Sequence, residues 1–244
     1  MDLSHSYHSQ FVNVKLSIIR QNAGVIIMSQ PSLFIGMGNE GKIREYESML
    51  SSSRCALKRM DALDPEETEP DLVGNAILKA RAYAKHSGGP TVSEDSGLII
   101  PCLGGLPGVY SARFADCLLD NLAVAEYRPS GRSRKEMDEA NNERILSLLR
   151  DVRGSKHKAM FRVVLVVASP NGTILFQDSA TSHGWIVENA RGTNGFGYDP
   201  IFVGEDTGGL TYAEIDPEKK NTHSHRHRVL IQFKRWIDQT FAPT

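Results

Sequence analysis

The sequence predicts an α/β fold in which a two-lobed mixed sheet is flanked by helices. Apolar segments of strand length alternate along the chain with amphipathic segments of helix length, as is typical of α/β domains. One long β-branched segment is followed by Asn171-Gly172, which predicts an antiparallel hairpin within the sheet. The 244 residues are enough for one large domain of two lobes.

The composition excludes several classes of protein. Hydrophobic residues make up 40% and charged residues 23%, which argues against a disordered chain. No apolar run approaches the roughly 20 residues of a membrane-spanning helix, so we expect no membrane partner. The formal net charge of -1 gives no global field that would attract nucleic acid, so an anionic ligand needs a local site. The 3 widely spaced cysteines favour a reducing, cytoplasmic compartment.

The first half of the chain contains a strand, two helices and a second strand. Residues 1–31 lack the order of features of a secretory signal and are predicted to be a poorly ordered extension; the domain is predicted over residues 32–244. The apolar patterns predict, in order, a strand at 32–36, a helix at 42–50, a helix at 72–86 and a brief strand at 91–93.

The second half begins with a loop rich in Gly and Pro and continues with the strongest strand signals. The patterns predict, in order, a loop at 103–111, an amphipathic helix at 134–150, a strand at 159–168, its hairpin return from 173 to 176, and a final helix at 224–241.

The glycine-bearing turn after the first strand predicts an anion site. Backbone N–H groups and the dipole of the following helix meet there, and Lys42 adds a positive charge. Gly36 to Lys42 satisfies the first seven positions of a Walker A loop, but Ile43 stands where a hydroxyl should bind magnesium. This mismatch argues against a P-loop NTPase, whereas a turn that serves only the fold remains an alternative.

Carboxylates gather at two places. Glu66 and Glu67 lie in an acidic loop that would ordinarily be solvated surface. Glu94 and Asp95 sit where a strand is predicted to break, and a carboxylate held beside apolar residues needs partners. Because magnesium takes oxygen ligands and needs only one or two protein carboxylates beside substrate phosphates, these residues are candidate ligands.

Two further segments suit recognition of a planar, anionic ligand. Residues 192–200 place Phe196 among glycines, so its ring is a stacking face, although it would also serve as a core plug. Residues 219–228 are the densest basic patch; their alternating histidines allow a zinc site, but no cysteine lies near. We favour Lys220 as a phosphate contact, with His225 and Arg226 donating to a ligand such as a 6-oxopurine.

The order of these segments resembles the inosine/xanthosine triphosphate pyrophosphatase family, from about residue 32 to the C-terminus. The matching segments are Gly38-Asn39-x-x-Lys42-x-x-Glu45, Glu66-Glu67-Thr68, Asn75-Ala76-x-x-Lys79-Ala80, Glu94-Asp95-Ser96-Gly97-Leu98, Leu103-Gly104-Gly105-x-Pro107-Gly108-Val109-Tyr110-Ser111-Ala112-Arg113, Gly195-Phe196-Gly197-Tyr198-Asp199-Pro200 and Glu218-Lys219-Lys220-Asn221-x-x-Ser224-His225-Arg226.

The resemblance implies a fold with a central substrate cleft, a homodimer, and Mg²⁺-dependent hydrolysis of ITP, dITP and XTP to the monophosphate and pyrophosphate. It implies that Glu66 and Asp95 hold the metal and that Asp95 is also the base for the attacking water. The implied substrate-binding residues are Met37, Gly38, Asn39, Lys42, Lys79, Ser96, Phe196, Gly197, Tyr198, Asp199, Lys220, His225 and Arg226.

Two positions depart from the family pattern. Met37 stands where Ser or Thr is usual, and Gly74 stands where Glu is usual. Loss of the hydroxyl at Met37 motivates an alternative function, a nucleotide-binding protein with weakened catalysis. A pyrophosphatase for modified pyrimidine nucleotides is a third hypothesis, against which Phe196 and the His225-Arg226 pair argue.

Overall fold

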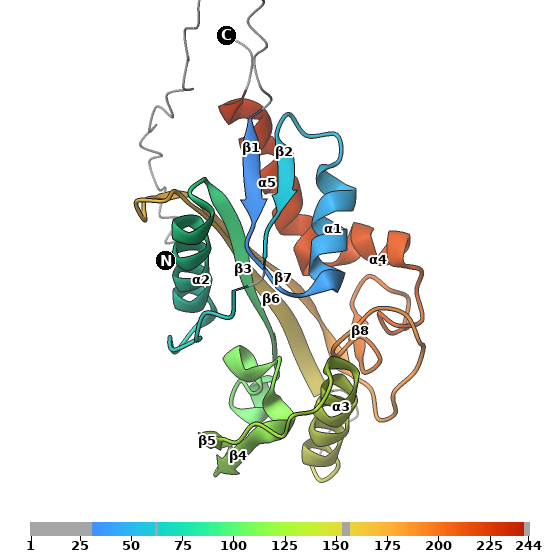
Figure 1. The fold of residues 1–244 in the computed structure, drawn as a ribbon. Coiled ribbons are helices and arrows are strands. Elements are labelled where there is room, and N and C mark those ends of the chain that lie inside the picture. Colours follow the sequence, from blue (N-terminus) through green and yellow to red (C-terminus); the bar gives the residue numbers. More distant parts are fainter. Residues whose placement is uncertain (1–30, 62, 153–156, 242–244) are drawn as a thin grey trace, which may run out of the picture.

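A computed structural model describes residues 31–61, 63–152 and 157–241 (Figure 1). Nearly all of the predicted N-terminal extension, residues 1–31, therefore lies outside the described residues. Within them, no helix is both long enough and apolar enough to cross a lipid bilayer.

A six-stranded mixed sheet forms the centre of the molecule, in the order β2-β1-β3-β6-β7-β8. Its strands are β1 (Ser32–Ile35), β2 (Ala56–Arg59), β3 (Thr91–Ile99), β6 (His157–Ala168), β7 (Ile174–Ile186) and β8 (Phe202–Gly204). β1 runs parallel to β2 and β3, whereas β3, β6, β7 and β8 pair antiparallel in succession. The predicted mixed α/β sheet with a long hairpin is confirmed.

Helices cover both faces of the upper part of this sheet (Figure 1). α1 (Glu40–Leu50) and α5 (His225–Thr240) pack on one face, and α2 (Leu72–Ser87) covers the other. α4 (Pro217–His223) leads into α5, and α3 (Arg134–Leu149) lies at the lower end. Each long helix begins at a residue whose side chain accepts a hydrogen bond from the first turn: Asn39, Asp71, Ser133 and Ser224.

The central position of β6 in the sheet explains why residues 163–168 are an unbroken apolar run. Successive side chains of a strand point to opposite faces, and both faces of β6 are covered here. Val163, Leu165 and Val167 join the core beneath α1 and α5, whereas Val164, Val166 and Ala168 join the core beneath α2.

The long strands continue into a second hydrophobic core at the lower end, which makes the predicted second lobe. There Ala159 and Ile186 pack with residues of α3 and the segment around Phe202. Three short 3₁₀ turns, η1 (Pro101–Leu103), η2 (Gly108–Tyr110) and η3 (Phe114–Asp116), and a separate two-stranded sheet of β4 (Cys117–Asp120) and β5 (Ala123–Tyr127) complete this lobe.

The strand predicted at 91–93 is longer than expected. β3 continues through Ser96 and Gly97 to Ile99 because it pairs with β6 along its whole length, from Thr91 opposite Ala168 to Ile99 opposite Met160. The polar residues of β3 therefore lie in the middle of a strand, and the expected strand break beside Asp95 is wrong.

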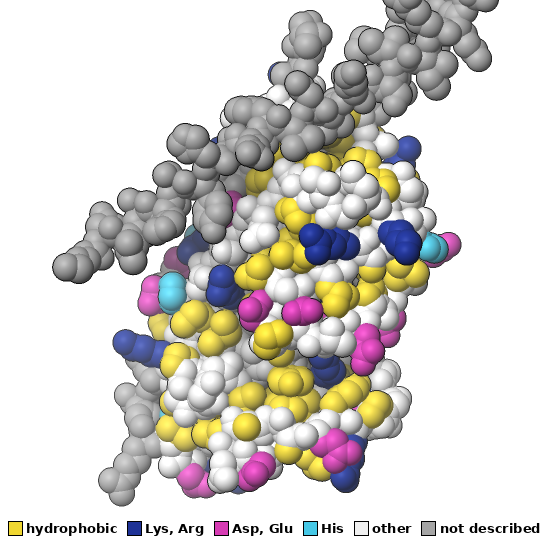
Figure 2. All heavy atoms as spheres, turned by 90° about the vertical axis from the view of Figure 1, so that its left-hand side faces the viewer, with side chains coloured by type: hydrophobic (Ala, Val, Ile, Leu, Met, Phe, Trp, Pro, Cys, Tyr) yellow, Lys and Arg dark blue, Asp and Glu magenta, His cyan; other side chains and the backbone are white. Residues whose placement is uncertain are grey.

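Charges of both signs are interspersed on one face of the molecule (Figure 2). On the face shown in Figure 2, Lys and Arg side chains lie among Asp and Glu side chains, with hydrophobic side chains between them. This mixture of signs agrees with the formal net charge of -1.

Candidate active site

The candidate site lies where β1 ends and β3 continues. β1 pairs with β3 only at Phe34 and Ile35, so the edge of β3 beyond this point is not covered by β1. In sheets with parallel strands, ligands bind beyond the carboxyl ends of the strands, where the chain turns away. Side chains from both faces of β3 can therefore converge on one cavity.

The cavity brings together the whole set of expected substrate-binding residues. The residues of that set that line it are Met37, Gly38, Asn39, Lys42, Lys79, Ser96, Phe196, Gly197, Tyr198, Asp199, Lys220, His225 and Arg226. Segments more than 150 residues apart in the sequence thus form one site: Gly38 belongs to the upper lobe, whereas Phe196 comes from the loop before β8.

The turn into α1 has the features of an anion site. Asn39 caps the helix by accepting a hydrogen bond from the backbone N–H of Lys42 at 3.1 Å. The Lys42 ammonium lies 3.1 Å from a carboxylate oxygen of Glu94. Burial lowers the pKa of Lys42, and the Glu94 carboxylate opposes this by favouring the charged form.

Phe196 packs directly against the first turn of α1 at Gly41. A Cβ at this position would lie 2.8 Å from two atoms of the Phe196 ring, so only glycine allows this approach. The ring also lies 4.7 Å from the Lys220 ammonium. Phe196 therefore lies between the first turn of α1 and Lys220 of the basic segment.

Glu94 and Asp95 point to opposite faces of the sheet. Glu94 contacts α1 and α5, whereas Asp95 accepts a hydrogen bond from Lys79 of α2 at 2.6 Å. Alternation along the strand gives Ser96 the same face as Glu94, and Ser96 lines the cavity. The two neighbouring carboxylates consequently have different surroundings and different chemistry.

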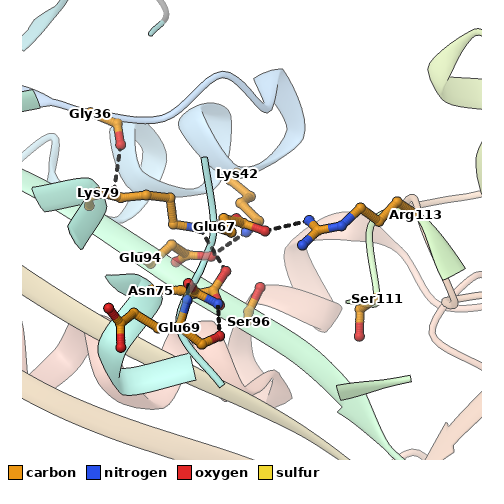
Figure 3. Close-up of polar contacts among 12 residues, drawn as sticks. Gly36, Lys42, Glu67, Glu69, Asn75, Lys79, Glu94, Ser96, Ser111 and Arg113 are labelled. Atoms are coloured by element: carbon orange, nitrogen blue, oxygen red, sulfur yellow. Dashed lines mark hydrogen bonds and ion pairs between the residues drawn. The ribbon is translucent and has the colours of Figure 1, made fainter. Parts of the chain in front are cut away.

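Glu67, rather than the expected Glu66, lies in the cavity. The Glu66 side chain is exposed and does not line the cavity, whereas one Glu67 oxygen accepts from Lys79 at 2.7 Å and the other from Arg113 at 2.6 Å (Figure 3). Sequence alone could not choose between adjacent glutamates, because the loop between β2 and α2 has no regular periodicity.

The Lys79 ammonium bridges two carboxylates, since it donates to both Glu67 and Asp95. Burial raises the pKa of Asp95, and Lys79 offsets only part of this effect. Burial also acts to raise the pKa of Glu67, but Lys79 and Arg113 outweigh it and leave that pKa below its usual value. The second oxygen of Asp95, Oδ2, is buried and has no hydrogen-bond partner among the described residues. Lys79 lines the cavity, whereas Asp95 itself does not.

At the other end of the cavity, Asp199 holds two neighbours in place. Its Oδ2 accepts from the backbone N–H of Phe196 at 2.8 Å and from the Lys220 ammonium at 2.6 Å. Burial raises the pKa of Asp199, and the charge of Lys220 opposes the shift. The carboxylate thus holds the backbone at Phe196 and the Lys220 ammonium on one oxygen.

Arg226 is at the centre of a buried ion network. Its guanidinium donates to Glu94 through Nε and Nη2 and to Glu45 through Nη1, and the Tyr46 hydroxyl also donates to Glu94. Despite its burial, Glu94 has a pKa far below its usual value, because Arg226 and Lys42 stabilise the carboxylate. Most donors of Arg226 are therefore engaged by the protein, which differs from the expectation that Arg226 reads a purine edge directly.

His225 is a buried, neutral side chain. Its ring stacks on Phe161 at a centroid distance of 5.0 Å. Burial and the neighbouring Arg226 charge hold the pKa of His225 well below its usual value. Within the described ranges, no three His, Cys, Asp or Glu side chains are grouped to hold a metal, so the alternative zinc site at the alternating histidines has no support there.

Comparison with known proteins gives the family. The Ham1 family model matches residues 33–236. The chain belongs to the Ham1 family. Among its relatives, a dITP/XTP pyrophosphatase of Rhodospirillum centenum is 39% identical over 214 residues, covering 86% of this chain and 95% of the relative. One from Methylococcus capsulatus is 38% identical over 200 residues, covering 80% and 90%.

Solved structures agree with this family assignment. The HAM1 protein from Coxiella burnetii superposes with a TM-score of 0.72 at 30% identity, covering 86% of this chain and 99% of that one. The Staphylococcus aureus Ham1 protein gives a TM-score of 0.67 at 30% identity, covering 85% and 98%. The family and fold expected from the sequence are thereby confirmed.

The packing of the loop before α2 explains why this Ham1 chain has glycine at position 74. A Cβ there would lie 2.6 Å from Cβ of Glu69, so the loop before α2 packs tightly on the helix. Asn75 holds the same loop by accepting from the Glu69 N–H at 3.0 Å and donating to its carbonyl at 3.2 Å (Figure 3). With glycine at position 74, the loop that carries Glu67 packs closely on α2 and is held there by Asn75.

Proposed function

We propose that this chain hydrolyses the non-canonical purine nucleoside triphosphates ITP, dITP and XTP to the monophosphate and pyrophosphate. One observation carries the proposal: a single cavity joins an anion-binding turn, buried carboxylates and a stacking ring. The names of its Ham1 relatives support the reaction and the substrate class.

The triphosphate would bind between the turn at Gly38 and Asn39 and the ammonium groups of Lys42 and Lys79. Both lysines are held by carboxylates in the free protein, at 3.1 Å from Glu94 and 2.6 Å from Asp95. Phosphate oxygens entering the cavity would compete for these ammonium groups. Met37 is buried and packs in the core, so we assign phosphate binding at the turn to the backbone and the lysines.

We assign Mg²⁺ to Glu67 and Asp95. The fit rests on two features: one ammonium lies within 2.7 Å of both carboxylates, and Oδ2 of Asp95 is buried without a partner. Hard carboxylate oxygens beside phosphate suit Mg²⁺. When bound, Mg²⁺ would neutralise charge on the phosphates and on the leaving pyrophosphate.

As the resemblance to the family implies, Asp95 would orient the attacking water and accept its proton. Lys79 holds Oδ1 of Asp95 and so fixes the carboxylate.

The purine would stack on Phe196 near the start of α5. The first N–H groups of a helix have no partner within it, so those of His225 and Arg226 are donors for a 6-oxo group. A 6-amino group would place its own N–H donors against these backbone N–H donors, and neither could then form a hydrogen bond. An unpaired buried polar group costs about 1–3 kcal/mol. This arrangement favours ITP and XTP over ATP.

The test is pyrophosphate release by the purified protein with Mg²⁺ from ITP, XTP, ATP and GTP. We expect ITP and XTP to turn over much faster than ATP, whose 6-amino group opposes these donors, and Asp95→Asn to abolish turnover with an unchanged circular dichroism spectrum. Equal turnover of all four nucleotides would exclude the proposed selectivity. Binding of ITP without turnover would instead favour the nucleotide-binding alternative.

The remaining expectations stay predictions. They are the homodimer, the cytoplasmic compartment and the absence of nucleic-acid and membrane partners.

A further inference from the structure

The loop that carries Glu67 is positioned by contacts rather than by secondary structure. It lies between β2 and α2, and residues 63–69 belong to no helix or strand. Asn75 fixes the loop at Glu69, two residues beyond Glu67. A carboxylate on such a loop needs a further anchor to keep one orientation.

Lys79 by itself does not define the orientation of Glu67, because its ammonium also pairs with Oδ1 of Asp95 at 2.6 Å. The second anchor is Arg113, whose Nη1 donates to the other Glu67 oxygen at 2.6 Å (Figure 3). The Arg113 and Glu67 side chains are 22% and 19% exposed, so solvent competes with this pair less than with a surface pair.

Arg113 approaches from the other lobe and is itself held by aromatic rings. It follows η2, and its guanidinium carbon lies 5.6 Å from the ring centroids of both Tyr110 and Tyr127. Tyr127 belongs to β5 of the small separate sheet and is 44% exposed. Cation–π contacts at this distance favour one placement of the guanidinium.

We propose that Arg113 is a positioning residue for Glu67 and that Tyr127 supports it from the small sheet. The importance of Glu67 rests on the proposed function, whereas the contacts of Arg113 do not. Through Arg113 and Tyr127, the small sheet of β4 and β5 would help to orient the Glu67 carboxylate that we assign to the metal. Replacing Arg113 should therefore weaken the binding of Mg²⁺ at the site without removing any group that lines the cavity.

The experiment compares Arg113→Gln, Arg113→Lys, Tyr127→Ala and Tyr127→Phe with the wild type. For each protein, the Mg²⁺ concentration for half-maximal ITP hydrolysis and kcat/KM are measured. We expect Arg113→Gln to raise that Mg²⁺ concentration or lower kcat/KM by about 10-fold to 100-fold, the range for residues that orient metal ligands. Arg113→Lys should recover part of the loss, Tyr127→Ala should shift the same quantities less, and Tyr127→Phe, which keeps the ring, should match the wild type.

Hydrogen exchange of residues 63–71 in the metal-free proteins gives an independent measurement. We expect faster exchange in Arg113→Gln and Tyr127→Ala. Arg128→Gln is the matched control, because Arg128 lies beside the same sheet but pairs with Glu126 in an exposed ion pair. Its exchange and kinetics should be those of the wild type.

Unchanged loop exchange together with unchanged Mg²⁺ dependence in Arg113→Gln would overturn the proposal, and so would equal effects in Arg128→Gln. If the wild type failed to hydrolyse ITP, the proposed function would fail while loop exchange would still test the role of Arg113. Should Arg113→Gln not fold, Arg113→Lys and Tyr127→Ala carry the same comparison.

Discussion

At the scale of single residues, adjacent glutamates have different roles in this chain. Glu67 accepts hydrogen bonds from Lys79 and Arg113 within the cavity, whereas Glu66 is exposed beside it. The Glu67 carboxylate shares the Lys79 ammonium with Asp95, whereas the exposed Glu66 carboxylate does not. The proposal that Glu67 holds the metal can therefore be tested by comparing substitutions of Glu66 and Glu67.

We predict that Glu67→Gln lowers kcat/KM for ITP by about 10-fold to 100-fold and raises the Mg²⁺ requirement, because an amide is a weaker ligand than a carboxylate. Glu66→Gln removes the same charge from the same loop and should leave both quantities near the wild-type values. Steady-state pyrophosphate release at several Mg²⁺ concentrations measures the difference. The assignment is incorrect if Glu66→Gln is the more damaging change.

At the scale of elements, the first turn of α1 and the loop before β8 fit together through a glycine. The contact between Gly41 and Phe196 joins the turn proposed to bind phosphate to the ring proposed to stack on the purine. The segments are separate in the sequence, but the fit allows one ligand to contact both.

We predict that Gly41→Ala raises the KM for ITP by about 10-fold or more, because the new Cβ displaces the Phe196 ring and base stacking is worth about 1–3 kcal/mol. Alanine normally stabilises a helix by up to about 1 kcal/mol relative to glycine, so lost stability is not the expected cause.

The control for Gly41→Ala is Ser48→Ala, an exposed position of the same helix. It should leave the KM unchanged. Kinetics and thermal unfolding of both variants separate the two effects, and a wild-type KM in Gly41→Ala would contradict the role of this contact.

At the scale of the whole molecule, Glu94 links three elements through buried charges. It lies on β3, pairs with Arg226 of α5 and Lys42 of α1, and accepts a hydrogen bond from Tyr46. Removing one member of such a network leaves buried charges without partners, which costs more than the loss of a surface pair.

We predict that Glu94→Gln lowers the free energy of unfolding at neutral pH by about 3–5 kcal/mol. The pKa of Glu94 is lowered on folding, so its contribution is present above the unfolded-state pKa of about 4.3 and is lost as the pH falls toward the folded value. The wild type should therefore lose stability below about pH 4.3 more steeply than Glu94→Gln.

Urea unfolding between pH 3 and pH 7 measures this difference. Glu126→Gln, which removes a carboxylate from an exposed ion pair with Arg128, is the control and should barely change stability. Parallel pH curves for the wild type and Glu94→Gln would show that Glu94 does not carry the proposed linkage.

Much of the fold was predictable because local patterns determine it. The helices at 72–86 and 134–150 match α2 and α3 closely, since caps and apolar periodicity act over a few residues. β2, β8 and the sheet of β4 and β5 were not predicted. Their strands have three to five residues, and their patterns are too short to separate from loops.

Residue types in a fixed order were enough to predict the family, the mixed sheet and the set of residues that line the cavity. Three features became visible only in the folded chain: which glutamate enters the cavity, which faces of the sheet Glu94 and Asp95 occupy, and how Arg113 reaches Glu67. These outcomes depend on strand register and on contacts between distant segments. No local pattern encodes them, because a shift of one residue along a strand reverses the face of every side chain.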